Sequence, residues 1–318
     1  MKLVRTIGEA RAALATLPRP LGLVPTMGAL HEGHLSLVQA ARERCATVAT
    51  SLFVNPTQFV PSEDFTRYPR DEQRDLALFA DHGVDLVFAP RADDMYAEGF
   101  ATVVHIVGPL TEDFEGAARA SHFDSVATIV TKLLMIVAPD LAFFGQKDAQ
   151  QLAVIRRLVS DLDLPVEIVA VETVREPDGL AKSSRNAYLD EHERPMATRL
   201  YQALQAGRAA ATRGAGPQEV AAAAAGALAG DGADGTADTA AGGPPRFALE
   251  YVAVVDADTF CKERALGPRS LLVAAARLGT TRLIDNLSLA PALPSERPPV
   301  RKTSAYLAKD ATAGKEDH

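Results

Sequence analysis

The sequence predicts an α/β protein built on a doubly wound parallel sheet, with a smaller C-terminal α+β domain. Between residues 21 and 172, short runs rich in β-branched and aromatic residues alternate with amphipathic helical patterns. The runs are apolar almost throughout, which is typical of parallel strands buried on both faces. The repeated order of strand, helix and strand implies right-handed crossovers within one sheet. Past about residue 174 the chain becomes polar and rich in turns.

The predicted strands and helices of the first part follow one another in order. The strands cover residues 21–26, 47–55, 84–90, 141–145 and 166–171. Helices are expected over residues 33–44 and 71–82, and along a buried stripe from Val126 to Val137 with i, i+3, i+4, i+7 spacing. Ligands of such sheets bind beyond the carboxyl ends of the strands. Polar segments at those ends are therefore the candidate site.

The C-terminal part has a different composition. We expect a helix over residues 194–213, an Ala/Gly-rich insertion over about 214–245, and strands at 247–256 and within 270–289. The second half of the insertion buries too little apolar surface to order, so we expect it to be flexible. A Pro-rich and then charged tail, residues 291–318, should be disordered. The expected domains are therefore 1–173 and 174–290.

Composition narrows the class of protein. The 318 residues are 47% apolar and 23% charged, which is ordinary for a globular chain with a sizeable core. The net charge of −8 argues against nucleic-acid or anionic-membrane partners. We find no apolar run of membrane-spanning length and no signal-peptide pattern in "MKLVRTIGEARAAL". Two cysteines make neither a disulfide framework nor a zinc set, so a cytoplasmic protein is expected.

The segment "VPTMGALHEGH" carries two histidines, His31 and His34, where a strand turns into a helix. The first amides of a helix favour an anion, and imidazoles beside them could donate to phosphate oxygens. A zinc site of the His-Glu-x-x-His type needs a spacing of four, whereas here the spacing is three. The remaining alternative is a surface turn with two incidental histidines. This stretch alone does not decide between the two.

Two more polar segments follow predicted strands. In "FVNPTQF", the amides of Asn55 and Gln58 could bind a hydroxyl or a carboxylate, or Asn-Pro could simply form a turn. In "FFGQKDAQQL", Lys147 suits phosphate and Asp148 a cation or a ribose hydroxyl, with one of the two following glutamines facing the site. The alternative for this segment is a solvated loop with Asp148 as a helix N-cap.

A fourth segment, "AKSSRN" at residues 181–186, holds an ammonium, two hydroxyls, a guanidinium and an amide. Such a density of donors fits a polyphosphate leaving group. An exposed loop is the alternative. It is less attractive because Arg175, Lys182 and Arg185 cluster within an acidic protein.

Taken in order along residues 1–290, these segments resemble one family. "VPTMGALHEGHLSLV", "SLFVNPTQF", "YPRDEQRDL", "HFDSVATIVTKLLMIVAPDLAFFGQKDAQQL", "TVREPDGLAKSSRNAYL" and "AARLGTTRLIDN" are similar to the pantoate–β-alanine ligases. The resemblance implies a Rossmann-like domain of the HIGH-motif nucleotidyltransferase superfamily, a smaller C-terminal lid domain and a homodimer. It also implies the chemistry: ATP and pantoate form pantoyl adenylate and pyrophosphate, and β-alanine then attacks to give pantothenate and AMP.

The resemblance also implies roles for individual residues. The implied ATP site comprises Met27, Gly28, Ala29, Leu30, His31, Glu32, Gly33, His34, Gly145, Gln146, Lys147, Asp148, Val174, Lys182, Ser183, Ser184 and Arg185. The implied catalytic residues among them are His31, His34, Lys147, Ser183, Ser184 and Arg185. Gln58 and Gln151 would hold pantoate, with Gln58 also near β-alanine. Mg²⁺ would screen the triphosphate, with Asp75 as a contributor through water.

Five positions depart from the pattern expected of that family. Lys182 stands in place of the more frequent methionine, Gln146 of glutamate, Ala149 of tyrosine and Ser125 of glycine, and Arg74 replaces an acidic residue. The same segments would also suit a relative that adenylates another small carboxylate, or a nucleotidyltransferase that uses CTP. A nucleotide-binding protein without turnover is the third alternative.

Overall fold

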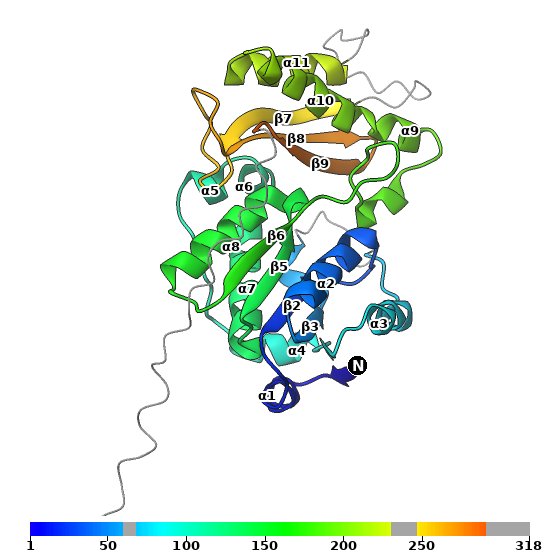
Figure 1. Ribbon diagram of the computed structural model, residues 1–318, viewed down its shortest axis with the longest axis vertical. Coiled ribbons are helices and arrows are strands. Elements are labelled where there is room, and N and C mark those ends of the chain that lie inside the picture. The colour runs from blue at the N-terminus through cyan, green and yellow to red at the C-terminus, as the bar shows by residue number, and fades with distance from the viewer. Residues whose placement is uncertain (60–67, 230–246, 291–318) are drawn as a thin grey trace, which may run out of the picture.

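The computed structural model describes residues 1–59, 68–229 and 247–290, which form two sheets (Figure 1). The larger sheet has six parallel strands in the order β1-β4-β3-β2-β5-β6. The smaller one has three antiparallel strands in the order β7-β8-β9. The strands are β1 (Lys2–Val4), β2 (Leu21–Thr26), β3 (Thr47–Leu52), β4 (Leu86–Phe88), β5 (Leu141–Gly145), β6 (Glu167–Val171), β7 (Phe247–Asp256), β8 (Ser270–Leu278) and β9 (Thr281–Ser288).

Helices cover both faces of the large sheet, which confirms the predicted doubly wound fold. One face packs against α1, α7 and α8, and the other against α2 and α3. Neighbouring residues of a strand serve opposite faces: in β2, Leu23 belongs to the first core cluster and Val24 to the second. The helices of this part are α1 (Ile7–Leu14), α2 (Glu32–Arg44), α3 (Glu72–Asp81), α4 (Ala92–Met95), α5 (Pro109–Glu112), α6 (Glu115–Ala118), α7 (His122–Val137) and α8 (Ala149–Asp161).

The predicted elements of the large sheet lie close to the observed ones. Strands β2 and β5 have the predicted bounds, whereas β3 and β4 are shorter than the apolar runs that contain them. The prediction missed β1 because three residues at a sheet edge, of which only Val4 is buried, leave no recognisable pattern.

The C-terminal domain differs from its prediction in two helical segments. The expected helix over 194–213 is two helices, α9 (Glu193–Ala197) and α10 (Arg199–Thr212). The first half of the Ala/Gly-rich insertion, for which the sequence predicted no element, is helix α11 (Pro217–Ala229), whose Val220, Ala224 and Leu228 are buried at intervals of four. Alanine favours helix, and three apolar side chains suffice for a stripe. The second half of the insertion and the predicted tail lie outside the described residues.

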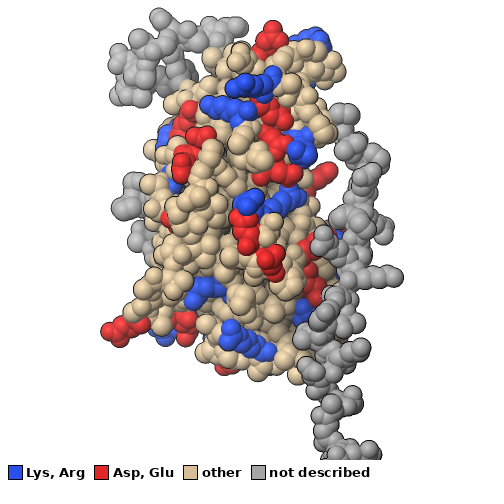
Figure 2. All heavy atoms as spheres, turned by 90° about the vertical axis from the view of Figure 1, so that its left-hand side faces the viewer, with Lys and Arg blue, Asp and Glu red and all other residues tan. Residues whose placement is uncertain are grey.

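The two sheets are joined by a shared apolar cluster. Helices α10 and α11 cover the outer side of the small sheet, and the large sheet lies on its other side (Figure 1). Between the sheets, Phe114, Phe123 and Val154 of the first part pack with Val255 and Phe260 of the second. The described residues include no helix long and apolar enough to cross a membrane. On the face drawn in Figure 2, basic and acidic side chains are interspersed.

The strand order reverses between β2 and β5, because β3 and β4 extend the sheet on one side and β6 on the other. In doubly wound sheets the crevice beyond the carboxyl ends of the two strands at such a reversal is the usual ligand site. Here those ends are Thr26 and Gly145, which begin two of the four polar segments.

Candidate active site

A cavity of about 250 Å³ opens at this reversal point. It brings together the four polar segments, which are separated by up to about 150 residues in the chain. The sequence-predicted residues that line it are Met27, His31, Gly33, His34, Gln58, Gly145, Lys147, Asp148, Gln151, Val174, Lys182, Ser183, Ser184 and Arg185. Gly28, Ala29, Leu30, Glu32, Gln146 and Asp75 are not among the lining residues.

His31 and His34 cap the start of helix α2 with their rings. His31 is the N-cap residue, and its Nδ1 accepts from Gly33 N at 3.1 Å. The Nδ1 atom of His34 accepts from His31 N at 3.4 Å. Because each Nδ1 is an acceptor, each ring carries its proton on Nε2. The ring centroids lie 4.2 Å apart, and both rings line the cavity.

Both imidazoles are neutral at pH 7. Burial, reinforced by the positive charge of Lys147, lowers the pKa of His31 to about 4. Burial, with the neighbouring His31, lowers the pKa of His34 to about 3. The pair therefore offers neutral N–H donors to an anion rather than full positive charges.

The turn between β2 and α2 is held by Asp75 of helix α3. Its Oδ2 accepts from Ala29 N at 2.9 Å and its Oδ1 from Leu30 N at 3.0 Å. Gly28 and Ala29 have φ of 81° and 52°, so these bonds stabilise a left-handed backbone that alanine adopts reluctantly. Asp75 is 1% exposed. Each carboxylate oxygen of Asp75 accepts one backbone N–H of the turn, and the metal role of Asp75 stays a prediction.

The turn after β5, η2 (Gln146–Asp148), presents Lys147 and Asp148 to the cavity. Their side chains are 3.8 Å apart at Nζ and Oδ1. The positive charges of Lys147 and Arg185 hold the pKa of Asp148 below its ordinary value. Gln146 is exposed and contributes its backbone carbonyl to a bond from Asn286 instead.

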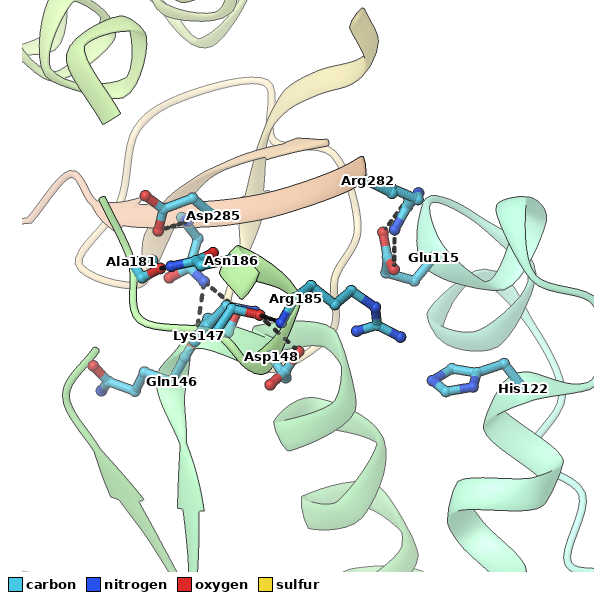
Figure 3. A network of polar contacts seen from close by, with 12 residues as sticks. Glu115, His122, Gln146, Lys147, Asp148, Ala181, Arg185, Asn186, Arg282 and Asp285 are labelled. Atoms are coloured by element: carbon cyan, nitrogen blue, oxygen red, sulfur yellow. Dashed lines mark hydrogen bonds and ion pairs between the residues drawn. The ribbon is translucent and has the colours of Figure 1, made fainter. Parts of the chain in front are cut away.

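The loop with the serines closes the opposite side of the cavity. Ser184 Oγ donates to Ala29 O at 3.2 Å, which ties η3 (Ser184–Tyr188) to the turn before α2. Lys182 Nζ forms ion pairs with Glu32 at 2.9 Å and Glu176 at 3.2 Å. Glu32 does not line the cavity but holds the ammonium of Lys182, which does. Arg185 extends between Asp148 and His122 (Figure 3).

The segment after β3 is a short turn, η1 (Pro56–Gln58), that is braced from several sides. Asn55 is 1% exposed and donates to Gln58 Oε1 at 3.2 Å, while its own Oδ1 accepts from Tyr96 at 2.9 Å. Ser125 Oγ donates to Thr57 O at 2.6 Å, a bond that glycine could not make. Asn55 therefore orients Gln58 toward the cavity, and Ser125 adds support to the turn.

Helix α8 separates the roles of its two glutamines. Gln151 lines the large cavity. Gln150 is 3% exposed, accepts from Glu115 N and donates to Leu110 O and Asp113 O. Gln150 is therefore a structural residue that holds the segment before α7.

Several cavity residues were absent from the predicted set. They are Tyr68, Arg119, His122, Glu172 and Thr173. Arg119 donates to Gln58 O at 3.1 Å and lies 3.0 Å from His122 Nε2. Arg119 and His122 also border a smaller cavity of about 90 Å³ between the two sheets, together with Lys147, Asp148 and Gln151. The sequence signal was the polar run "ARASH" directly before the buried stripe of α7.

Comparison with known proteins identifies the family. The model of the family described as pantoate-beta-alanine ligase matches residues 2–288. The chain belongs to this family. A pantothenate synthetase of Roseiflexus sp. (strain RS-1) is 52% identical over 289 residues, which cover 91% of this chain and 99% of that protein. A pantothenate synthetase of Thermus thermophilus is 48% identical over 294 residues, covering 92% and 100%.

Solved structures agree with the family assignment. A crystal structure of pantothenate synthetase from Thermus thermophilus superposes with a TM-score of 0.84 at 47% identity, covering 92% of this chain and all of that one. A pantoate-beta-alanine ligase from Francisella tularensis, complexed with beta-gamma ATP and beta-alanine, gives 0.73 at 29% identity, covering 92% and 99%. As a member of this family, the chain is a ligase that joins pantoate to β-alanine and forms pantothenate.

Proposed function

We propose that the large cavity binds ATP and pantoate and forms pantoyl adenylate with release of pyrophosphate. The amine of β-alanine then attacks the acyl carbon, the amide bond forms, and AMP leaves with the electrons of the broken acyl–oxygen bond. The observation that carries the proposal is the meeting of four donor-rich segments at the reversal point of the sheet. No residue needs to form a covalent intermediate in this scheme.

The triphosphate would lie between the start of α2 and the loop Lys182–Arg185. On one side, His31 and His34 direct neutral Nε2–H donors into the cavity beside the helix N-terminus. On the other, Lys147, Ser183, Ser184 and Arg185 supply charges and hydroxyls. Attack of the pantoate carboxylate on the α-phosphorus builds negative charge on phosphoryl oxygens, and these donors stabilise it without rearranging.

The two other substrates would lie toward Gln58. We place pantoate between Gln58 and Gln151, whose amides both line the cavity, and the adenine near the backbone of Val174. We place β-alanine beside Gln58, where Arg119 offers a positive charge for its carboxylate. Asn55 fixes the rotamer of Gln58, so both placements depend on a side chain that is already oriented.

Mg²⁺ would enter as the ATP complex, held by phosphate oxygens and water. The described residues contain no cluster of three or more His, Cys, Asp or Glu side chains suited to a metal ion. Each carboxylate oxygen of Asp75 accepts a backbone N–H of the turn. We therefore place the ion mainly on the triphosphate.

We also propose that the domains divide at residues 173 and 174, with residues 174–290 completing the site as its lid. The chain leaves β6 at Val171 and enters the loop that lines the cavity, before the small sheet begins. A cytoplasmic location is proposed because Cys45 and Cys261 are both free thiols.

A homodimer is the proposed assembly. Residues 101–107 belong to neither sheet formed by the described residues. Val103 and Val107 on this segment are 60% and 75% exposed. Two exposed apolar side chains this close together are suited to contact with a second copy of the chain.

The first half-reaction has a direct test. Labelled pyrophosphate should exchange into ATP when pantoate is present and β-alanine is absent. His34→Ala should slow this exchange roughly 100-fold or more, the usual cost of one lost transition-state donor. Gln39→Ala, on the exposed side of the same helix, should leave it unchanged.

Absence of exchange in the wild type would contradict the proposed function, and exchange with a different carboxylate alone would favour the related adenylating enzymes. Because His34 also accepts from His31 N, His34→Asn tests the donor while keeping a polar group at the cap. Unchanged exchange in both variants would remove His34 from the mechanism.

A further inference from the structure

Two adjacent residues of β9 reach the two segments that we assign to the nucleotide, one directly and the other through Arg175. Asn286 donates both hydrogens of its side-chain amide, to Gln146 O and to Lys147 O, each at 2.9 Å. Asn286 as a whole is 8% exposed. Both carbonyls belong to the backbone of the turn η2, from which the Lys147 side chain extends into the cavity. Asn286 therefore fixes the backbone position of that lysine.

Asp285 holds the other segment through Arg175. The two side chains form a paired ion bridge with N–O distances of 2.6 and 2.9 Å. The same guanidinium donates to Gly179 O at 3.1 Å and stacks on the Tyr201 ring at 4.1 Å. It also donates to the backbone carbonyl of Asn286 at 3.2 Å. Arg175 is thus held by β9, by its own loop and by α10.

The contacts that hold Arg175 also position the loop Lys182–Arg185. Arg175 and Ala181 form a β-bridge, and Lys182 N donates to Val174 O at 2.9 Å. The chain from Val174 to Lys182 is therefore a closed hairpin whose base is held by Asp285. Lys182 is the first residue of the loop that faces the phosphates. Figure 3 shows Asp285 on β9 above the turn that carries Lys147.

We propose that Asp285 and Asn286 are positioning residues that couple the Gln146–Asp148 turn to the Lys182–Arg185 loop, so that both segments act on the same triphosphate. The inference rests on the proposed function of the cavity. The backbone of Lys147 sets the positions that its ammonium can reach. A displaced turn moves that charge away from the triphosphate and weakens the binding of ATP. Because Asp285 and Asn286 are adjacent on one strand, they fix the position of the two segments relative to each other.

The test is the kinetics of pyrophosphate exchange in variants of β9. Asn286→Ala removes both donors, and Asp285→Asn removes the charge that holds Arg175. Each should raise the KM for ATP by about tenfold or more, and leave the KM for pantoate within about twofold of the wild type. Ser288→Ala, an exposed position at the end of the same strand, is the matched control and should change neither KM.

The double variant distinguishes coupling from two separate effects. If both residues act through one anchor, Asp285→Asn combined with Asn286→Ala should raise the KM for ATP by less than the product of the single effects. Asn286→Ser, which keeps one hydroxyl donor, replaces Asn286→Ala should the latter not fold. Its KM for ATP should lie between those of the wild type and of the alanine variant.

Two results would overturn the inference while leaving the proposed function in place. In the first, the wild type exchanges pyrophosphate and the variants have the same KM for ATP as the wild type. The other is a fall in kcat alone, with both KM values unchanged, as expected for a merely smaller folded fraction. Failure of the wild type to exchange would instead overturn the proposed function and, with it, this inference.

Discussion

Lys182 shows how a charged side chain is accommodated at the edge of the proposed phosphate site. Its ammonium is 2.9 Å from Glu32 and 3.2 Å from Glu176, and its side chain is 17% exposed. The hydrogen bond to Glu32 holds the pKa of Lys182 above its ordinary value. The charge that would otherwise be added beside the phosphates is thus balanced by two carboxylates. The three side chains join the serine loop to the first turn of α2.

Lys182→Met removes the ammonium and should keep activity within about tenfold, a barrier change of about 1.4 kcal/mol. The reason is that Lys182 already has carboxylate partners, while Lys147 and Arg185 remain to meet the phosphates. Exchange kinetics at varied ATP measure the effect. Complete loss of exchange would show that this lysine is indispensable in the chain.

At the scale of an element, the start of α2 makes stability depend on pH. The ordinary pKa of histidine is 6.5, whereas the folded His31 and His34 have pKa values of about 4 and about 3. At pH values between the folded pKa values and 6.5, the histidines of the unfolded chain bind more protons than those of the folded chain. The free energy of unfolding therefore decreases as the pH falls below 6.5, and the two histidines leave it unchanged above that pH.

We expect the melting temperature of the wild type to fall more steeply from pH 7 to pH 5 than that of the double variant His31→Gln/His34→Gln. The buried His34 alone should account for about 2 kcal/mol at pH 5, at about 1.36 kcal/mol per pH unit. Differential scanning calorimetry at half-unit intervals measures the slopes. Equal slopes of melting temperature against pH for the two proteins would contradict the inference that His31 and His34 are neutral in the folded chain.

The elements differ in how far the sequence predicts them. Strands β2 and β5 are buried runs bounded by turns, so period and composition identify them. Helix α11 was missed because its composition resembles that of the glycine-rich residues after it, although Val220 and Leu228 carry the helical spacing. The site residues within motifs were recognised by their resemblance to a family. The bonds of Asp75 were not predicted, because they reach a turn 45 residues earlier in the chain.

For the whole molecule, the small sheet is fastened to the large one on two sides of the site. On one side, Arg282 pairs with the buried Glu115 at 2.6 and 2.7 Å, and Tyr251 donates to the same carboxylate at 2.8 Å. Burial alone would raise the pKa of Glu115, but Arg282 holds it below its ordinary value. On the other side, Asn286 of the same strand, β9, holds the turn that carries Lys147. These long-range contacts have no local pattern, so the sequence did not predict them.

The proposed dimer is also a property of the whole molecule. Light scattering should give the wild type the mass of two chains. The double variant Val103→Arg/Val107→Arg should have the mass of one chain, because charges on residues 101–107 oppose the burial of this segment in an interface. Leu249→Arg, at a 42% exposed position on β7, is the control and should remain a dimer. A wild type with the mass of one chain would refute the proposal.

The contacts of β9 also set an order of events during synthesis. All six strands of the large sheet, and both nucleotide segments, leave the ribosome before residues 285 and 286 are made. Until then, the carbonyls of Gln146 and Lys147 lack their amide partner and Arg175 lacks its carboxylate. A nascent chain with a complete large sheet therefore still lacks both anchors of the proposed ATP site. The proposed coupling of the two segments can form only after the last described strand has been translated and docked.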